Sequence, residues 1–180
     1  MKFRILGSQV VIETGDPVAA EAGVLVVPAN NFLWMGGAVA TAVRDVAGEA
    51  VETEASAKGP GTLGQAIATS AGAMAVDQLL HAVIVGQDLQ ADPGTVAEAT
   101  RACLEHVARA KPGHRRVVFP PLGLDPGGLD VAVVARAMVG AIIEALMGGV
   151  TVDEVRLWLP DAKAQAEFVG AAGTHFTRSR

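Results

Sequence analysis

Two glycine-rich segments are the first candidates for chemistry in this sequence. Residues 28–39 read PANNFLWMGGAV, and residues 120–128 read PPLGLDPGG; each follows a short apolar run and precedes a helical pattern. Glycine lets the backbone approach phosphate oxygens closely, and the free N–H groups at a helix start favour negative charge. Two such loops facing each other would suit a diphosphate, although a Gly-Gly pair alone is more often a plain turn.

The elements that must position these loops alternate between strand and helix patterns. Strands are predicted at residues 24–27, 81–85, 117–119 and 154–159, with one or two edge strands at 3–6 and 9–13 and another at 66–70. Helices are predicted over 95–110, where Thr95 and Glu98 form a capping-box pair, and over 129–147, which Gly148 and Gly149 end.

This alternation predicts a three-layer α/β/α fold around a mixed, mostly parallel sheet of about six strands. The 180 residues contain no internal repeat and no long linker, so we expect a single domain spanning 1–180. In open α/β sheets ligands bind at the carboxyl ends of the strands, which is where both glycine-rich loops begin.

Composition narrows the functional classes. No apolar run reaches the ~20 residues that cross a bilayer, and no secretory signal precedes the first strand pattern, so we expect a cytoplasmic protein without membrane contact. The net charge of −5 argues against polyanion binding through bulk electrostatics, and His114-Arg115-Arg116 is expected to be a solvated strand entrance. Cys103 is expected to lie buried on a helix face, and no metal site is indicated.

No Ser-His-Asp set or paired carboxylate stands out either. His81 lies in a predicted strand, His106 in a predicted helix and His114 in a turn, so none is an evident general base.

Five short segments, in the same order along the chain, resemble motifs of the macrodomain family. Residues 14–16 are similar to its Gly-Asp-Ile-Thr turn, and residues 26–39 to its Asn-Ala-Ala-Asn loop with the glycine run that follows. Residues 63–66 are similar to its Thr-Gly-Glu-Ala strand start, residues 81–83 to its Ile-His-Thr strand, and residues 119–120 to the Phe-Pro that enters its second loop. The resemblance covers nearly the whole chain and implies a stand-alone macrodomain of the bacterial type, whose ligand would be ADP-ribose.

The resemblance also implies roles for individual residues. Asp16 would accept a hydrogen bond from the adenine amine, and Asn30 would bind the distal ribose and, in a hydrolase, help to place the reacting centre. The loop residues implied to bind the ligand are Gly36, Gly37, Ala38, Val39, Gly123, Leu124, Asp125, Pro126, Gly127 and Gly128. Residues that could contact adenine are Trp158, Pro160, Phe32 and Trp34. Asp16 and Asn30 could instead serve only as turn residues, and Trp158 as a core residue.

Several positions depart from the family pattern. Pro28 is matched with the first Asn of the loop motif, and Ala40 with the aspartate that orients water in one hydrolase branch. In the second loop, Asp125 brings negative charge beside a diphosphate and Pro126 removes an N–H. The Asp125 carboxylate could face the ligand, point to solvent, or cap the helix predicted from residue 129.

Three functions follow from these observations. The first is a module that binds ADP-ribose or an ADP-ribosylated protein or nucleic acid, and Ala40 favours it. The second is a hydrolase acting on ADP-ribosyl groups or O-acetyl-ADP-ribose through Asn30. The third is a degenerate macrodomain whose nucleotide ligand has changed or been lost. No cofactor is expected apart from the ligand itself, and the sequence makes no prediction of oligomeric state.

Overall fold

The computed structural model describes residues 1–21 and 23–177 of the chain. Within these residues a single sheet runs in the order β1-β2-β7-β6-β3-β5-β4. Its strands are β1 (Lys2–Ile5), β2 (Ser8–Thr14), β3 (Val24–Asn30), β4 (Ala66–Thr69), β5 (Gln78–Val85), β6 (Arg116–Phe119) and β7 (Glu154–Leu159). The five inner strands, in sheet order β2, β7, β6, β3 and β5, are parallel to one another. The two edge strands, β1 and β4, pair antiparallel with their neighbours. The mixed, mostly parallel sheet is confirmed, with seven strands where about six were predicted.

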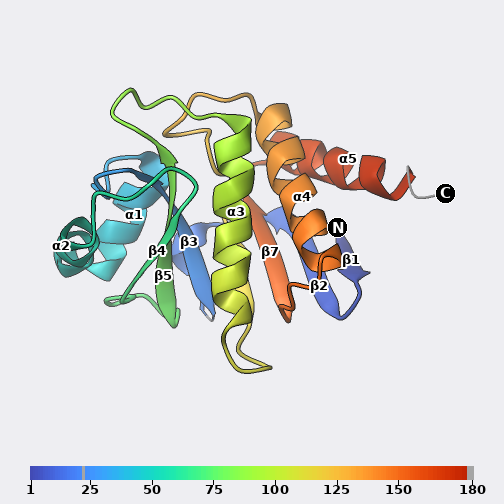
Figure 1. Cartoon of the computed structure of the whole chain (residues 1–180), viewed down its shortest axis with the longest axis horizontal. Helices are drawn as coiled ribbons and strands as arrows, with labels where there is room; N and C mark the ends of the chain where they lie inside the picture. The colour runs from blue at the N-terminus through green and yellow to red at the C-terminus, as the bar shows by residue number, and fades with distance from the viewer. Residues whose placement is uncertain (22, 178–180) are drawn as a thin grey trace.

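Helices cover both faces of the sheet, which makes the three predicted layers (Figure 1). The helices are η1 (Pro17–Ala19), α1 (Ala38–Ala47), α2 (Glu49–Ala57), α3 (Pro93–Ala108), α4 (Val131–Met147) and α5 (Ala162–Thr177). Helices α3, α4 and α5 pack on one face, while α1 and α2 pack on the other.

The larger core lies between the sheet and α3, α4 and α5. Its fully buried side chains include Leu104, Phe119, Met138 and Phe168. Burying a side chain of this size stabilises the fold by about 1.5–3 kcal/mol relative to leaving it exposed. Strand β5 shows why the central strands read as apolar runs, because every residue after Gln78 is buried. The sheet therefore holds in place the loops that follow the carboxyl ends of its central strands.

The start of α3 differs from the prediction. Asp92, not Thr95, is the N-cap residue, and its Oδ1 accepts a hydrogen bond from the backbone N–H of Gly94 at 2.6 Å. Pro93 follows at the first helical position, where its fixed φ suits a helix and its missing N–H is not needed. The pair of Asp92 and Pro93 therefore sets the boundary, and the capping box proposed for Thr95 and Glu98 was wrong.

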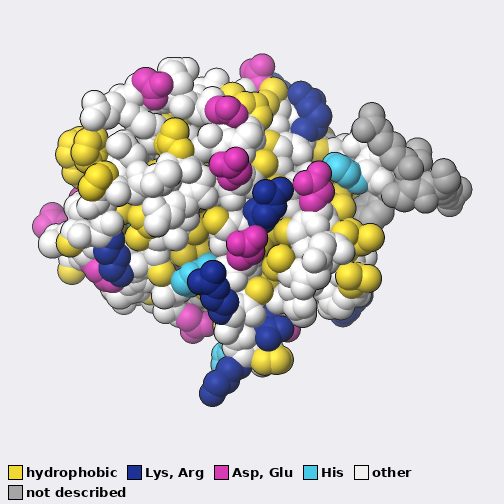
Figure 2. Space-filling model, in the orientation of Figure 1, with side chains coloured by type: hydrophobic (Ala, Val, Ile, Leu, Met, Phe, Trp, Pro, Cys, Tyr) yellow, Lys and Arg dark blue, Asp and Glu magenta, His cyan; other side chains and the backbone are white. Residues whose placement is uncertain are grey.

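Charged side chains of both signs are interspersed on the face formed by α3 and α4 (Figure 2). Residues 114–116 lie at the surface just before β6 becomes buried, as predicted for a strand entrance. Cys103 is buried on α3, and burial raises the pKa of its thiol. None of the described helices combines the length and the apolar character needed to span a bilayer.

Candidate functional site

The two glycine-rich loops follow neighbouring parallel strands and meet at one edge of the sheet. The loop after β3 leads into α1, and the loop after β6 leads towards α4. The loop after β5 joins them, since Gln90 forms a bridge with Gly127. Figure 1 shows the loops after β5 and β6 side by side at the top of the molecule. The prediction that both glycine-rich loops open onto the carboxyl ends of the strands is confirmed.

The two loops are in direct contact. The Asp125 carboxylate Oδ2 accepts a hydrogen bond from the backbone N–H of Ala38 at 2.9 Å. Beside it, Gly37 is so close to the second loop that an added Cβ would lie 2.7 Å from Pro126 Cδ. The Asp125 side chain is exposed to solvent, and its carboxylate is directed at the first loop, at the start of α1. The carboxylate does not cap α4, whose N-cap residue is Asp130.

This contact separates two cavities. The larger cavity, of about 620 Å³, is lined by Asn30, Asn31, Phe32, Trp34, Gly36, Gly37, Gly86, Gln87, Leu89, Asp125 and Pro126. The smaller cavity, of about 220 Å³, is lined by Gly15, Pro17, Ala38, Val39, Pro120, Pro121, Leu124, Asp125, Trp158 and Pro160. Asp125 lines both, so its side chain stands at the junction of the cleft.

Trp158 forms one wall of the smaller cavity and is held in a fixed orientation. Its Nε1 donates a hydrogen bond to Glu13 Oε1 at 3.0 Å, and the Arg156 guanidinium lies 6.0 Å from the ring centroid. Arg156 also pairs with Glu13, with its Nη1 3.3 Å from Oε1. The indole packs directly on Gly15, where an added Cβ would lie 2.6 Å from Trp158 Cγ. The absence of a side chain at Gly15 therefore makes room for the ring.

Asp16 lies at the rim of the smaller cavity, between two residues that line it, Gly15 and Pro17. Its Oδ1 accepts a hydrogen bond from the backbone N–H of Val18 at 3.1 Å and caps η1. The turn-holding role considered for Asp16 is therefore present. Its other oxygen makes no hydrogen bond within the described part of the chain, which leaves one acceptor at the cavity rim.

Asn30 organises the wall of the larger cavity. Its Oδ1 accepts from the Phe32 N–H at 3.0 Å, and its Nδ2 donates to the Trp34 carbonyl at 2.8 Å. The rings of Phe32 and Trp34 stack with centroids 4.9 Å apart and planes 18° apart, and Trp34 is 61% exposed. The amide of Asn30 thus holds a turn that presents two aromatic rings, as the turn-residue reading anticipated.

Comparison with known proteins identifies the family. The sequence model of the Macro domain family matches residues 26–138. The protein belongs to the macro domain family. An uncharacterized protein from Aeropyrum pernix is 35% identical over 147 residues, which cover 79% of this chain and 77% of that protein.

Solved macrodomain structures share the fold. The Oceanobacillus iheyensis macrodomain with ADP has a TM-score of 0.87 and 23% identity, and the alignment covers 99% of this chain and 97% of that one. The Trypanosoma brucei macrodomain in complex with ADP-ribose has a TM-score of 0.76 and 19% identity, and the alignment covers 93% of this chain and 69% of that one.

Two departures of this macrodomain from the family pattern lie away from the cavity walls. Pro28 is buried inside β3, where it pairs with Ala82 of β5, and the pairing of β3 with β6 is confined to Val24 and Leu25. A strand tolerates proline where its missing N–H faces no partner strand. Ala40 is 3% exposed within α1, and its methyl group cannot orient a water molecule.

The glycines of the second macrodomain loop shape the loop rather than line a cavity. Gly127 has a φ of 133°, and an added Cβ would lie 2.6 Å from the Gly123 carbonyl oxygen. That carbonyl in turn accepts a hydrogen bond from the Leu129 N–H at 2.9 Å. Gly123, Gly127 and Gly128 therefore bring Leu124, Asp125 and Pro126 to the cleft.

The sequence analysis did not identify the loop after β5 as part of the cleft of this macrodomain. Gly86, Gln87 and Leu89 follow β5 and line the larger cavity. The sequence contained a signal for this loop, because the predicted strand of residues 81–85 is followed by Gly86. The predicted strands of residues 24–27 and 117–119 are followed by a proline in the same way. The rule that ligands gather at the carboxyl ends of parallel strands applies to it equally.

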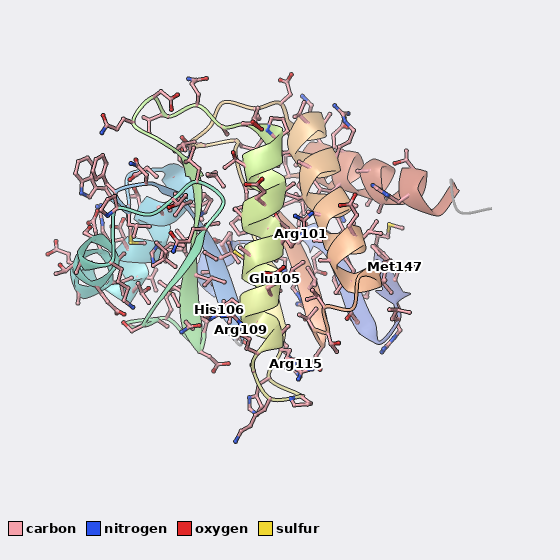
Figure 3. The ribbon with its side chains drawn as sticks, in the orientation of Figure 1. Arg101, Glu105, His106, Arg109, Arg115 and Met147 are labelled. Atoms are coloured by element: carbon pink, nitrogen blue, oxygen red, sulfur yellow. The ribbon has the colours of Figure 1, made fainter. Side chains whose placement is uncertain are left out.

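The described histidines of this macrodomain offer no general base in the cleft. His81 is buried in β5, where its Nε2 lies 2.9 Å from Thr69 Oγ1, and burial lowers its pKa to about 4. His106 contacts Gln78, the first residue of β5, through a 2.8 Å bond between Nε2 and Oε1. Figure 3 shows His106 low on α3, at the opposite end of the sheet from the loops. No cluster that could hold a metal ion occurs among the described residues.

Proposed function

We propose that this protein binds ADP-ribose, free or as an ADP-ribosyl group on a macromolecule, in the cleft between its two glycine-rich loops. The observation that carries the proposal is the arrangement of two cavities on either side of the α1 N-terminus. A ligand with two end groups joined by an anionic linker matches that arrangement. The macrodomain structures with ADP and with ADP-ribose, which align over more than nine-tenths of this chain, support the assignment.

Adenine is proposed to occupy the smaller cavity. The Trp158 ring offers it a stacking surface, and the free oxygen of Asp16 offers an acceptor to its amine. This placement excludes Phe32 as a second adenine contact, because Phe32 lines the larger cavity.

The diphosphate is proposed to cross the start of α1. The first N–H groups of a helix have no partner within the helix and attract anions. Ala38 already donates to Asp125, whereas the N–H groups of Gly37 and Val39 make no hydrogen bond to another described residue. The distal ribose would then lie in the larger cavity beside Asn30 and the stacked rings of Phe32 and Trp34.

We propose binding rather than hydrolysis. Both ends of the Asn30 amide are engaged by the loop backbone, so the side chain is committed to the turn. Ala40 supplies no carboxylate, and the histidines lie outside the cleft.

The test is titration calorimetry with ADP-ribose and with adenosine. We expect Trp158→Ala to weaken the binding of both ligands by about fivefold or more, because base stacking on an aromatic ring is worth about 1–3 kcal/mol. Trp34→Ala is the matched control, since it removes the same ring from the other cavity. It should leave adenosine binding unchanged.

Folding of each variant is checked by its melting temperature, and Trp158→Phe should restore most of the affinity. Wild-type protein that is folded but gives no binding signal at millimolar ADP-ribose would refute the proposed function. Equal losses from Trp158→Ala and Trp34→Ala would refute the placement of adenine.

A further inference from the structure

The N-terminus of α1 is in contact with a carboxylate of the protein itself, that of Asp125. Gly37, the N-cap residue, has no side chain to accept from the helix, and Pro126 leaves no room for one. The cap is supplied instead by Asp125, from a residue 87 positions further along the chain. A carboxylate in this place satisfies a helix donor and complements the positive end of the helix dipole.

We propose that Asp125 is the residue that sets the ligand specificity of the cleft, because its carboxylate occupies the position that a ligand diphosphate needs. The inference rests on the proposed function. Asp125 stands where the two cavities join, so a ligand that reaches from one to the other must pass it. Such a ligand must displace the carboxylate from Ala38 or bind beside it.

The consequence depends on ligand charge. A nucleoside in the smaller cavity leaves the bond between Asp125 and Ala38 intact, whereas a diphosphate brings like charges to it. Each pair of like charges about 4 Å apart lowers affinity about fivefold even in water-like screening. With two phosphates, the carboxylate is expected to weaken ADP-ribose by about tenfold or more while leaving adenosine nearly unaffected. The carboxylate thereby lowers the affinity for diphosphate-linked ligands and leaves that for nucleosides nearly unchanged.

Asp125→Asn is the decisive variant. Asparagine keeps an oxygen that can accept from the Ala38 N–H and has nearly the same shape, so the substitution removes the charge alone. Asp130→Asn is the matched control, because Asp130 is exposed, lies five residues further along, makes no side-chain cap bond and lines neither cavity.

Affinities for ADP-ribose and adenosine are measured by calorimetry at low and at high salt. Each measurement is made once with EDTA and once, separately, with Mg²⁺. Asp125→Asn should bind ADP-ribose about tenfold more tightly than wild type, with a change of less than about twofold for adenosine. The gain should shrink at high salt, where exposed charges are screened. Asp130→Asn should match wild type with both ligands.

Three results would overturn the inference. Equal ADP-ribose affinity in wild type and Asp125→Asn would refute it while leaving the proposed function standing. Tighter binding by wild type, with or without Mg²⁺, would mean that the carboxylate assists the ligand, directly or through a cation. Failure of both folded proteins to bind either ligand would refute the proposed function, and the inference would fall with it.

Discussion

We predict that acidification destabilises this protein through His81. The side chain is 1% exposed, and its Nε2 bonds to Thr69 Oγ1 inside the sheet. Burial lowers its pKa from the ordinary 6.5 to about 4; Glu54 opposes this effect and Lys58 adds to it. The folded protein therefore keeps His81 neutral at a pH where the unfolded chain protonates it.

The sign and size of the effect follow from this difference. Between about pH 6.5 and about pH 4 the unfolded chain binds more protons, so the free energy of unfolding rises with pH in that range. The contribution of His81 is fully present above pH 6.5 and is lost as pH falls towards 4. Because one pKa unit corresponds to about 1.4 kcal/mol, the full loss is about 3 kcal/mol. About 2 kcal/mol of it should be gone by about pH 5.

The assay is urea denaturation at several pH values between about 7.5 and about 4.5, with unfolding free energies compared between variants. His81→Gln keeps a polar partner for Thr69 but cannot titrate, so its stability should vary less with pH than that of wild type. His114→Gln, which removes an exposed histidine, should behave like wild type. Hydrogen bonds from Ser70 and Lys58 lower the pKa of Glu54 to about 2. The stability that Glu54 contributes is therefore lost mainly below about pH 4.5, outside the range of the assay.

A wild-type loss below about 0.5 kcal/mol between about pH 7.5 and about pH 5 would refute the reasoning. So would an equal loss in His81→Gln. Either result would mean that the protein accommodates a charged imidazole at this site, through a water molecule or a shift of the Thr69 hydroxyl.

Three further outcomes test other parts of the structure. Gly127→Ala should lower the free energy of unfolding by about 2 kcal/mol or more, because the residue has a positive φ and its Cβ would collide with Gly123, and urea denaturation measures it. Asp92→Ala should cost about 1 kcal/mol in the same assay, through loss of the α3 cap. Cys103 should not react with a thiol reagent in the folded protein and should react once urea unfolds it, because the thiol is buried; immediate labelling of native protein would contradict this.

The central strands were predictable because each is covered on both faces. Strands β3, β5 and β6 consequently consist mostly of apolar residues, with His81 of β5 as the polar exception away from the strand ends. This pattern needs no tertiary information. The predicted end of β3 at residue 27 fell three residues short. Pro28 was taken as the end of the strand, whereas β3 continues to Asn30 alongside β5 alone.

Two helices gave no usable signal. Helix α2 buries only Val51 and Ala55, one helical turn apart, so its sequence contains little hydrophobic periodicity. In α5 the buried positions do have helical spacing, but apart from Phe168 they are alanines, which hardly differ from their surroundings in hydrophobicity. Both helices are stabilised by packing against other elements, α2 against α1 and β4 and α5 against α4 and β2, and a periodicity argument does not detect such packing.

Asp125 shows most clearly what a local rule cannot supply. In the sequence, the nearest helix start is that of α4, and the capping rule favours a carboxylate there. In the structure, Gly127 and Gly128 have φ angles of 133° and 67° and turn the chain so that Asp130 reaches the N-cap position of α4. Asp125 is left facing α1, whose own N-cap residue has no side chain. The glycines, interpreted from the sequence as a cradle for phosphate, thus also direct a carboxylate to the start of α1, where we propose that the ligand diphosphate binds. On that proposal, the carboxylate and the diphosphate compete for the same helix N-terminus.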